Sequence, residues 1–153
     1  IFDQIAESKN LEVKNARRRE NIHKHIDKYV TGENDKRVET WSVDIKARKK
    51  TSRSDSDAQD EWIWIEFQNV RGNLGWLYGE ADNIAFETQD SFVIVDRKSL
   101  IDYVENAVDM AKPVRKSYLA KYKTYQRAGR NDLLTMVELS KIIENCKHFV
   151  WQK

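Results

Sequence analysis

Residues 62–68 alternate between two kinds of side chain with a period of two, which is the spacing of a β-strand rather than of a helix. One face of this strand is wholly apolar and carries Ile63, Ile65 and Phe67. Glu66 and Gln68 lie together on the opposite face. A chain with such a strand must bury the apolar face against a core, so it needs a sheet with at least one covered side.

A second segment, residues 37–47, has the same period. Its apolar residues, Val43 among them, share one face, and Asp44 points away from them. If the two strands pair, Asp44 lies close to Glu66 and Gln68. Carboxylate and amide oxygens are ligands that Mg²⁺ takes in proteins, so the two strands together predict a magnesium site.

The composition fits one globular domain that spans residues 1–153. Hydrophobic residues make up 40% of the chain and charged residues 34%, which is enough for a core and a solvated surface. No apolar run approaches the length of a membrane-spanning helix. The single Cys146 fits a reducing compartment, and we expect a cytoplasmic protein. With one cysteine and three histidines, a structural zinc site is not expected.

The charges are divided along the chain, although the net charge is only +2. Residues 9–53 carry 14 Lys and Arg against 7 Asp and Glu, residues 54–111 carry 3 against 13, and residues 112–153 carry 10 against 3. A protein that binds a phosphate backbone around a metal-holding centre would have this basic, acidic, basic order. Charged helices and loops that only face solvent give the same counts, so that interpretation stays open.

The order of the expected elements predicts an α/β (α+β) fold. We expect an N-terminal helix over residues 1–30, a sheet core with the metal site over residues 36–110 and a basic C-terminal extension over residues 113–153. The core would hold a central mixed β-sheet of about four to five strands flanked by helices. The expected strands are 37–47, 62–70, 81–87, 91–96 and 133–137, and the expected helices are 100–110, with Ser99 as N-cap, and 139–146. Residues 48–60 are polar without periodicity and predict either a flexible hairpin tip or a partly disordered segment.

A helix, a strand with Asp44 and a next strand with Glu66-x-Gln68 together resemble the restriction-endonuclease-like superfamily, the PD-(D/E)xK nucleases. The pattern of that superfamily is an Asp at the first metal position, then a Glu and usually a Lys, one residue apart, on the following strand. Asp44 matches the Asp, Glu66 matches the Glu, and Gln68 stands where Lys is usual. Residues 75–82 and 92–97 also look like segments of small phage-type members.

This resemblance implies a restriction-endonuclease-like core and a Mg²⁺-dependent DNA endonuclease, with Mn²⁺ as an alternative metal and DNA as the partner. Asp44 and Glu66 would hold the metal, and Gln68 would supply an oxygen ligand or position the attacking water. Many members add a catalytic Glu from the first helix. Glu20 has a suitable distance in sequence from Asp44, whereas Glu12 has the better helical phase. A homodimer is one arrangement that would cut both DNA strands.

Basic residues near these strands are candidates for contacts with DNA phosphates. They are Lys46, Arg48, Lys49, Lys50 and Arg53 after the Asp44 strand, and Arg127 and Arg130 around Gly129. Tyr118, Tyr122 and Tyr125 alternate with further cations, a mixture that either stacks on unpaired bases or packs a tyrosine face on the core. Core packing is the preferred interpretation of these tyrosines.

Other functions fit the same residues. Asp44, Glu66 and Gln68 are also what the solvent-facing halves of two amphipathic strands would carry. A non-catalytic nucleic-acid-binding module would keep the fold and the basic flanks, and the missing lysine favours it. A protein-interaction domain would use the acidic middle of the chain to bind a basic partner. The Mg²⁺-dependent endonuclease is the leading hypothesis.

Overall fold

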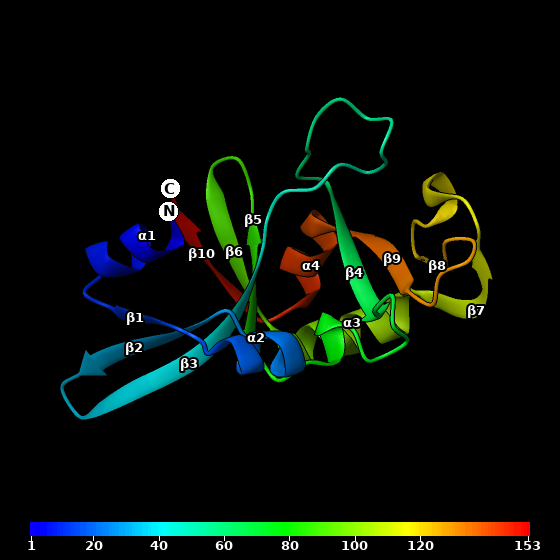
Figure 1. The fold of residues 1–153 in the computed structure, drawn as a ribbon. Coiled ribbons are helices and arrows are strands. Elements are labelled where there is room, and N and C mark those ends of the chain that lie inside the picture. The colour runs from blue at the N-terminus through cyan, green and yellow to red at the C-terminus, as the bar shows by residue number, and fades with distance from the viewer.

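The computed structural model describes residues 1–153, apart from the side chain of Asn34. It is an α+β protein with two separate β-sheets, one of six strands and one of four (Figure 1). The helices are α1 (Phe2–Ser8), α2 (Arg18–Lys24), α3 (Arg97–Ala107), α4 (Leu139–Asn145) and the short 3-10 helices η1 (Trp76–Tyr78) and η2 (Ser117–Leu119). None of the helices in the described chain is long and apolar enough to cross a lipid bilayer.

The six-stranded sheet combines strands from both ends of the chain. In spatial order it consists of β1 (Glu12–Asn15), β2 (Lys28–Asn34), β3 (Arg37–Lys46), β5 (Asn83–Glu87), β6 (Ser91–Asp96) and β10 (His148–Gln152). Neighbouring strands are antiparallel except β3 and β5, which are parallel. In the β2–β3 hairpin, Lys28 pairs with Val43. This register brings the start of β2 beside the end of β3.

The four-stranded sheet lies apart from the larger one. In spatial order it consists of β4 (Trp62–Gln68), β9 (Leu133–Glu138), β8 (Lys123–Tyr125) and β7 (Asp109–Val114). β4 and β9 are antiparallel neighbours, although they are far apart in sequence. Residues 47–61, which we name the crossing loop, run from the end of β3 in one sheet to the start of β4 in the other (Figure 1).

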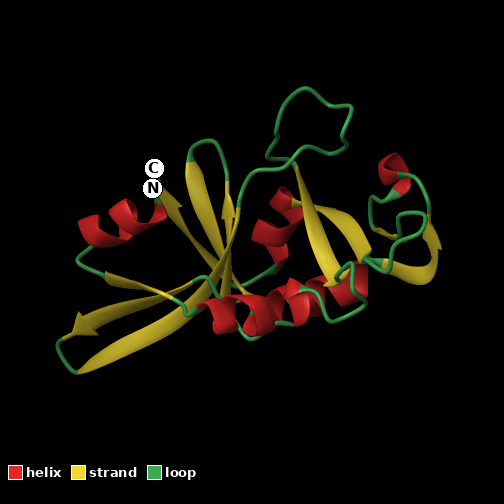
Figure 2. Cartoon of the chain, viewed as in Figure 1, coloured by secondary structure: helices red, strands yellow, loops and turns green.

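The main hydrophobic core joins the six-stranded sheet to β4, α3 and α4. Of these helices, drawn in red in Figure 2, α3 contacts β6 of the larger sheet and α4 contacts β9 of the smaller one. The buried residues of this core include Phe86 of β5, Ile65 of β4, Leu100 of α3 and Ile142 of α4. A second cluster packs α1 against the opposite face of the six-stranded sheet, where Phe2 contacts the ring of Trp151 at a centroid distance of 5.1 Å. The six-stranded sheet is therefore covered on both faces, so a polar side chain in its central strands is buried unless it lies near a strand end.

The structure confirms the α+β class and corrects the expected sheet. Separate sheets of six and four strands replace the expected central sheet of four to five strands. β4 has the predicted faces, because Ile65 and Phe67 are buried in the main core and Ile63 packs against it. Asp96 rather than Ser99 caps α3, and its carboxylate accepts a hydrogen bond from the Ser99 backbone N–H at 2.9 Å.

The expected helix over residues 1–30 is wrong, because this segment forms α1, β1, α2 and the start of β2. Asn10 and His25, with φ angles of 60° and 54°, adopt the left-handed conformation that interrupts a helix. Residues 113–153 are not an extension either. They supply β8, β9 and α4, and β10 returns to the six-stranded sheet.

Candidate functional site

Asp44 and Glu66 lie on strands of different sheets. β3 pairs with β2 and β5, whereas β4 pairs with β9, so the expectation that the two strands pair is wrong. Glu66 accepts a hydrogen bond from the Trp76 backbone N–H at 3.3 Å, and the Gln68 amide donates to the Asn131 carbonyl. A bulge in β4 separates Glu66 from Gln68. The strand pairing that was expected to bring all three side chains together is therefore absent from the described chain.

The close partner of Asp44 is Asp27, which immediately precedes β2. The register of the β2–β3 hairpin ends with Lys28 opposite Val43, and one further step along each strand brings Asp27 beside Asp44. Asp27 N–H donates to the Val43 carbonyl at 2.8 Å, and Asp27 Oδ2 accepts from the Ile45 N–H at 2.7 Å. The other oxygen, Oδ1, accepts from the Asn21 side chain of α2 at 2.5 Å. The hairpin and α2 therefore hold two carboxylates side by side.

Asp44 is only 4% exposed. The Lys46 ammonium forms an ion pair with its Oδ2 at 3.0 Å. Burial raises the pKa of Asp44 to about 7, Lys46 acts in the opposite direction, and the neighbouring Asp27 carboxyl adds to the rise. Near neutral pH, a small change in the surroundings therefore decides the charge of Asp44, which is a common property of functional carboxyls.

We expect Asp44→Asn to stabilise the metal-free protein above neutral pH and to change its stability little near pH 4. The folded state holds a proton on Asp44 that the unfolded chain, with a pKa near 3.8, releases, so this group lowers stability as the pH rises from about 4 to about 7. The difference between the two pKa values corresponds to at most about 4 kcal/mol. Urea unfolding in EDTA across this range measures it, with the exposed Asp102→Asn as the matched control. If Asp44→Asn raised the free energy of unfolding equally at about pH 4 and about pH 7, this account would be contradicted.

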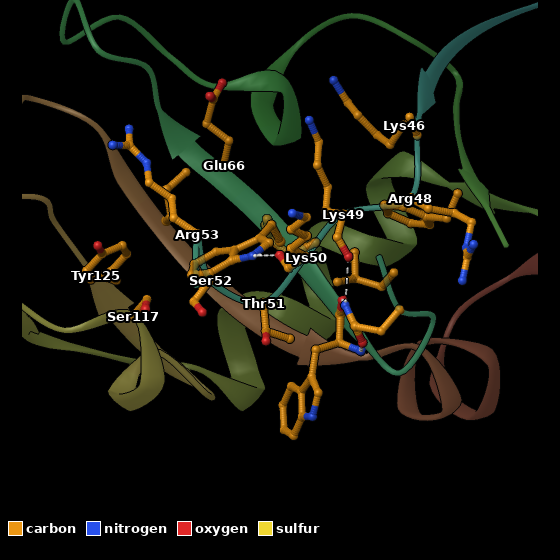
Figure 3. A pocket seen from close by; sticks show the side chains of 18 of the residues that line it. Lys46, Arg48, Lys49, Lys50, Thr51, Ser52, Arg53, Glu66, Ser117 and Tyr125 are labelled. Atoms are coloured by element: carbon orange, nitrogen blue, oxygen red, sulfur yellow. Dashed lines mark hydrogen bonds between the residues drawn. The ribbon is translucent and has the colours of Figure 1, made fainter. Parts of the chain in front are cut away.

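Lys46 connects the carboxylate pair to a basic pocket of about 950 Å³. The pocket lies between the end of β3, the crossing loop and β4, and Asp44 itself does not line it. The Lys46 ammonium lies 5.0 Å from the centre of the Trp76 ring, another lining residue. Glu66 lines the same pocket from β4 (Figure 3). The structure thus brings Lys46 and Glu66 to one cavity, with Asp44 joined to it through Lys46.

Three cations of the pocket have no partner for their charged groups in the described part of the chain. These are Lys49, Lys50 and Arg53, all exposed on the crossing loop (Figure 3). Six of the seven expected DNA-binding cations line this pocket, and Arg130 does not. The unpaired charges are available to an anion from solution, such as the phosphates of a nucleic acid.

The two remaining arginines of the pocket are already paired. Arg48 forms an ion pair with Asp60 at 2.6 Å and so braces the crossing loop. Arg127 forms an ion pair with Asp132, which is 1% exposed. Because both guanidinium groups neutralise a carboxylate of the chain, they are weaker candidates for a phosphate than the three unpaired cations.

Glu20 is used within the N-terminal part of the chain. Its Oε1 accepts from the Arg17 N–H at 3.1 Å, which caps α2, and its other oxygen accepts from the Tyr29 hydroxyl. The hydrogen bonds from Tyr29 and Arg17 lower the pKa of Glu20. The residue of α2 that contacts the carboxylate pair is Asn21, through Asp27.

Sequence reasoning missed Asp27 because residues 1–30 were expected to be helical. The feature that could have indicated Asp27 is the β2–β3 hairpin, in which Asp35 and Lys36 separate two strands of similar pattern. Counting outward from that turn places Asp27 opposite Asp44. The strand period also indicates Lys46, because it follows Asp44 by two residues and therefore lies on the same face.

No similarity to another protein supports the assignment of the carboxylate pair. Comparison of the chain with protein-family models, curated proteins and solved structures found no match. Among the described residues, no group of three or more His, Cys, Asp or Glu is placed to hold a metal ion. Any metal at Asp27 and Asp44 would therefore complete its coordination with water or substrate.

Proposed function

We propose that the protein is a metal-dependent DNA endonuclease whose metal-binding carboxylates are Asp27 and Asp44. The observation that carries the proposal is the proximity of these two carboxyls, of which Asp44 is buried and ion-paired with a lysine that lines a basic pocket. This assignment keeps Asp44 from the sequence analysis. It gives the second ligand position to Asp27 in place of Glu66.

The donor set fits Mg²⁺, or Mn²⁺ in its place. Mg²⁺ usually keeps several waters and is held by one or two carboxylates together with substrate phosphates. Asp27 and Asp44 supply two carboxylates, and Asp44 Oδ2 would exchange its ion pair with the Lys46 ammonium for the metal. When bound, the metal would polarise the scissile phosphate and lower the pKa of a bound water.

The side chains of the pocket would perform the remaining tasks. Lys46 would place its ammonium beside the scissile phosphate, where a fixed positive charge stabilises the charge that develops. Lys49, Lys50 and Arg53 would hold the flanking phosphates. Glu66 faces the pocket and stays a candidate for positioning the attacking water, whereas the amide of Gln68 is engaged with the Asn131 carbonyl.

The new assignment also follows the PD-(D/E)xK pattern more closely. Asp27 takes the first position at the start of one strand, and Asp44-x-Lys46 supplies an acid and a lysine, one residue apart, on the next strand. The assignment from sequence needed Gln68 in the place of the lysine. This agreement supports the endonuclease proposal.

The direct test is incubation of the protein with supercoiled plasmid and Mg²⁺ or Mn²⁺, with EDTA as the control. We expect conversion of the plasmid to nicked or linear forms that EDTA prevents. A protein that binds DNA and leaves the plasmid intact with both metals would contradict the proposal.

We expect the double variant Lys49→Gln, Lys50→Gln to weaken DNA binding and to reduce its dependence on salt. Each phosphate contact releases counterions, so losing two lysines should flatten the slope of log K against log salt by about one to two. Fluorescence anisotropy over a range of salt concentrations in EDTA measures the slope. The matched control is Lys14→Gln, Lys147→Gln, because neither of these exposed lysines lines the pocket. An equal change in both double variants would mean that the crossing loop has no particular role.

A second function is favoured by one observation. Lys46 already neutralises Asp44, and burial keeps the pKa of Asp44 near neutrality, so the pair carries less negative charge than a strong metal site. A non-catalytic nucleic-acid-binding module would need the basic pocket alone. Binding of DNA without metal-dependent cleavage, and without any effect of Mg²⁺ on thermal stability, would favour this alternative.

A further inference from the structure

We infer that the basic pocket binds DNA at unpaired bases, which stack on Trp64 and Tyr125 while the crossing loop holds the phosphates. This inference rests on the proposed function and names the class of substrate. It starts from the composition of the pocket, which combines unpaired cations on one side with aromatic rings on another.

The aromatic side of the pocket belongs to the four-stranded sheet. Trp64 of β4 and Tyr125 of β8 are half-buried, and their rings lie 5.8 Å apart between centroids at an angle of 43°. The Trp64 indole N–H donates to the Lys50 carbonyl at 3.1 Å. This hydrogen bond fixes the ring against the loop that carries Lys49, Lys50 and Arg53. The aromatic and cationic surfaces are therefore held next to each other before any ligand arrives.

The other aromatic residues near this face already have partners. The Tyr122 hydroxyl contacts that of Tyr103, and its ring packs against the main core. The Lys121 ammonium lies 4.6 Å from the centre of the Trp62 ring, and Lys46 occupies a similar position at Trp76. Among the described residues, the pocket aromatics without a cation over the ring are Trp64, Tyr125 and Phe86, and Phe86 is only 1% exposed. Trp64 and Tyr125 are thus the two that a base can reach.

The dimensions and chemistry of the pocket select an unpaired base over a duplex. Cavities of about 300–1,000 Å³ accommodate drug-sized ligands, so a pocket of about 950 Å³ has room for one or two nucleotides. A base that leaves its stack offers an aromatic face to Trp64 or Tyr125, and such stacking tolerates any base. The bases of an intact duplex are stacked on one another, so a duplex reaches only the cations.

The test compares a fluorescein-labelled single strand with a blunt duplex of the same length, by anisotropy at low salt in EDTA. We expect the wild-type protein to prefer the single strand. Trp64→Leu and Tyr125→Leu should each weaken single-strand binding about 5- to 100-fold and leave duplex binding within about twofold. Trp41→Leu is the matched control, because Trp41 packs against Phe149 and Trp151 away from the pocket.

The outcomes separate this inference from the proposed function. Equal affinity of the wild-type protein for both DNAs would overturn the inference and leave the endonuclease proposal standing. Binding of neither DNA would overturn both. If circular dichroism shows that Trp64→Leu is unfolded, the comparison rests on Tyr125→Leu, and quenching of the wild-type tryptophan fluorescence by the single strand gives an independent measurement. Absence of quenching would also overturn the inference.

Discussion

Asp44→Asn should abolish Mg²⁺-dependent DNA cleavage and leave DNA binding intact or tighter. The substitution removes a negatively charged ligand atom without changing the shape of the side chain. Mutating a group that only orients a metal ligand typically costs 10- to 100-fold, so losing the ligand itself should cost at least about a hundredfold in the cleavage rate. Binding should not weaken, because a negative charge next to the phosphate site has been removed. Plasmid cleavage and anisotropy on the same preparations measure the two effects.

Two further substitutions identify the partner of Asp44. Asp27→Asn should lose cleavage to a similar extent, whereas Glu66→Gln should keep activity within a few-fold if Glu66 only positions water. The reverse order, with Glu66 essential and Asp27 dispensable, would restore the assignment drawn from the sequence. Asp102→Asn on the exposed face of α3 is the matched control for removing one carboxylate. Full activity of both Asp27→Asn and Asp44→Asn would show that neither carboxylate holds a catalytic metal.

Arg127→Met should destabilise the fold by about 3–5 kcal/mol, because it leaves a buried carboxylate without its partner. Asp132 is 1% exposed, and Arg127 Nε donates to its Oδ2 at 2.8 Å. The other carboxylate oxygen, Oδ1, accepts no hydrogen bond from the described atoms, so no second group takes over when the guanidinium is removed. Chemical denaturation monitored by circular dichroism measures the loss.

A double variant shows whether the buried charge is the cause. Arg127→Met, Asp132→Asn removes both charges and should recover a large part of the lost stability. Arg130→Met, three residues away and exposed, should change the free energy of unfolding by less than about 0.5 kcal/mol. If the double variant were as unstable as Arg127→Met, packing of the arginine stem rather than charge would explain the loss. Weak DNA binding by Arg127→Met therefore has to be corrected for unfolded protein.

Side-chain periodicity predicted the faces of the long strands correctly. Ile65 and Phe67 are buried together, and Asp44 lies on the opposite face from Val43. Periodicity determines which side chains share a face, but it does not determine which strands are neighbours. β4 pairs with β9 rather than with β3, and the crossing loop that separates β3 from β4 is long enough to reach a different sheet.

The N-terminal segment could not be predicted for a different reason. Apolar residues between positions 11 and 29 recur at the three- and four-residue steps of a helix, although this segment forms β1, α2, the start of β2 and the turns between them. The interruptions fall at Asn10 and His25, which are not glycine or proline and so give no strong signal in the sequence. Because the start of β2 was hidden in an expected helix, the position of Asp27 opposite Asp44 was hidden with it.

The packing of α1 against β10 has a consequence for how the protein is made. Phe2, near the start of the chain, lies against Trp151, near its end, and both belong to the cluster on one face of the six-stranded sheet. On the ribosome, the first helix is synthesised long before the strand that completes its packing surface. Contacts of such long sequence separation form slowly. The half of the protein that contains the hairpin with Asp27 and Asp44 should therefore reach its final form only after β10 has left the ribosome.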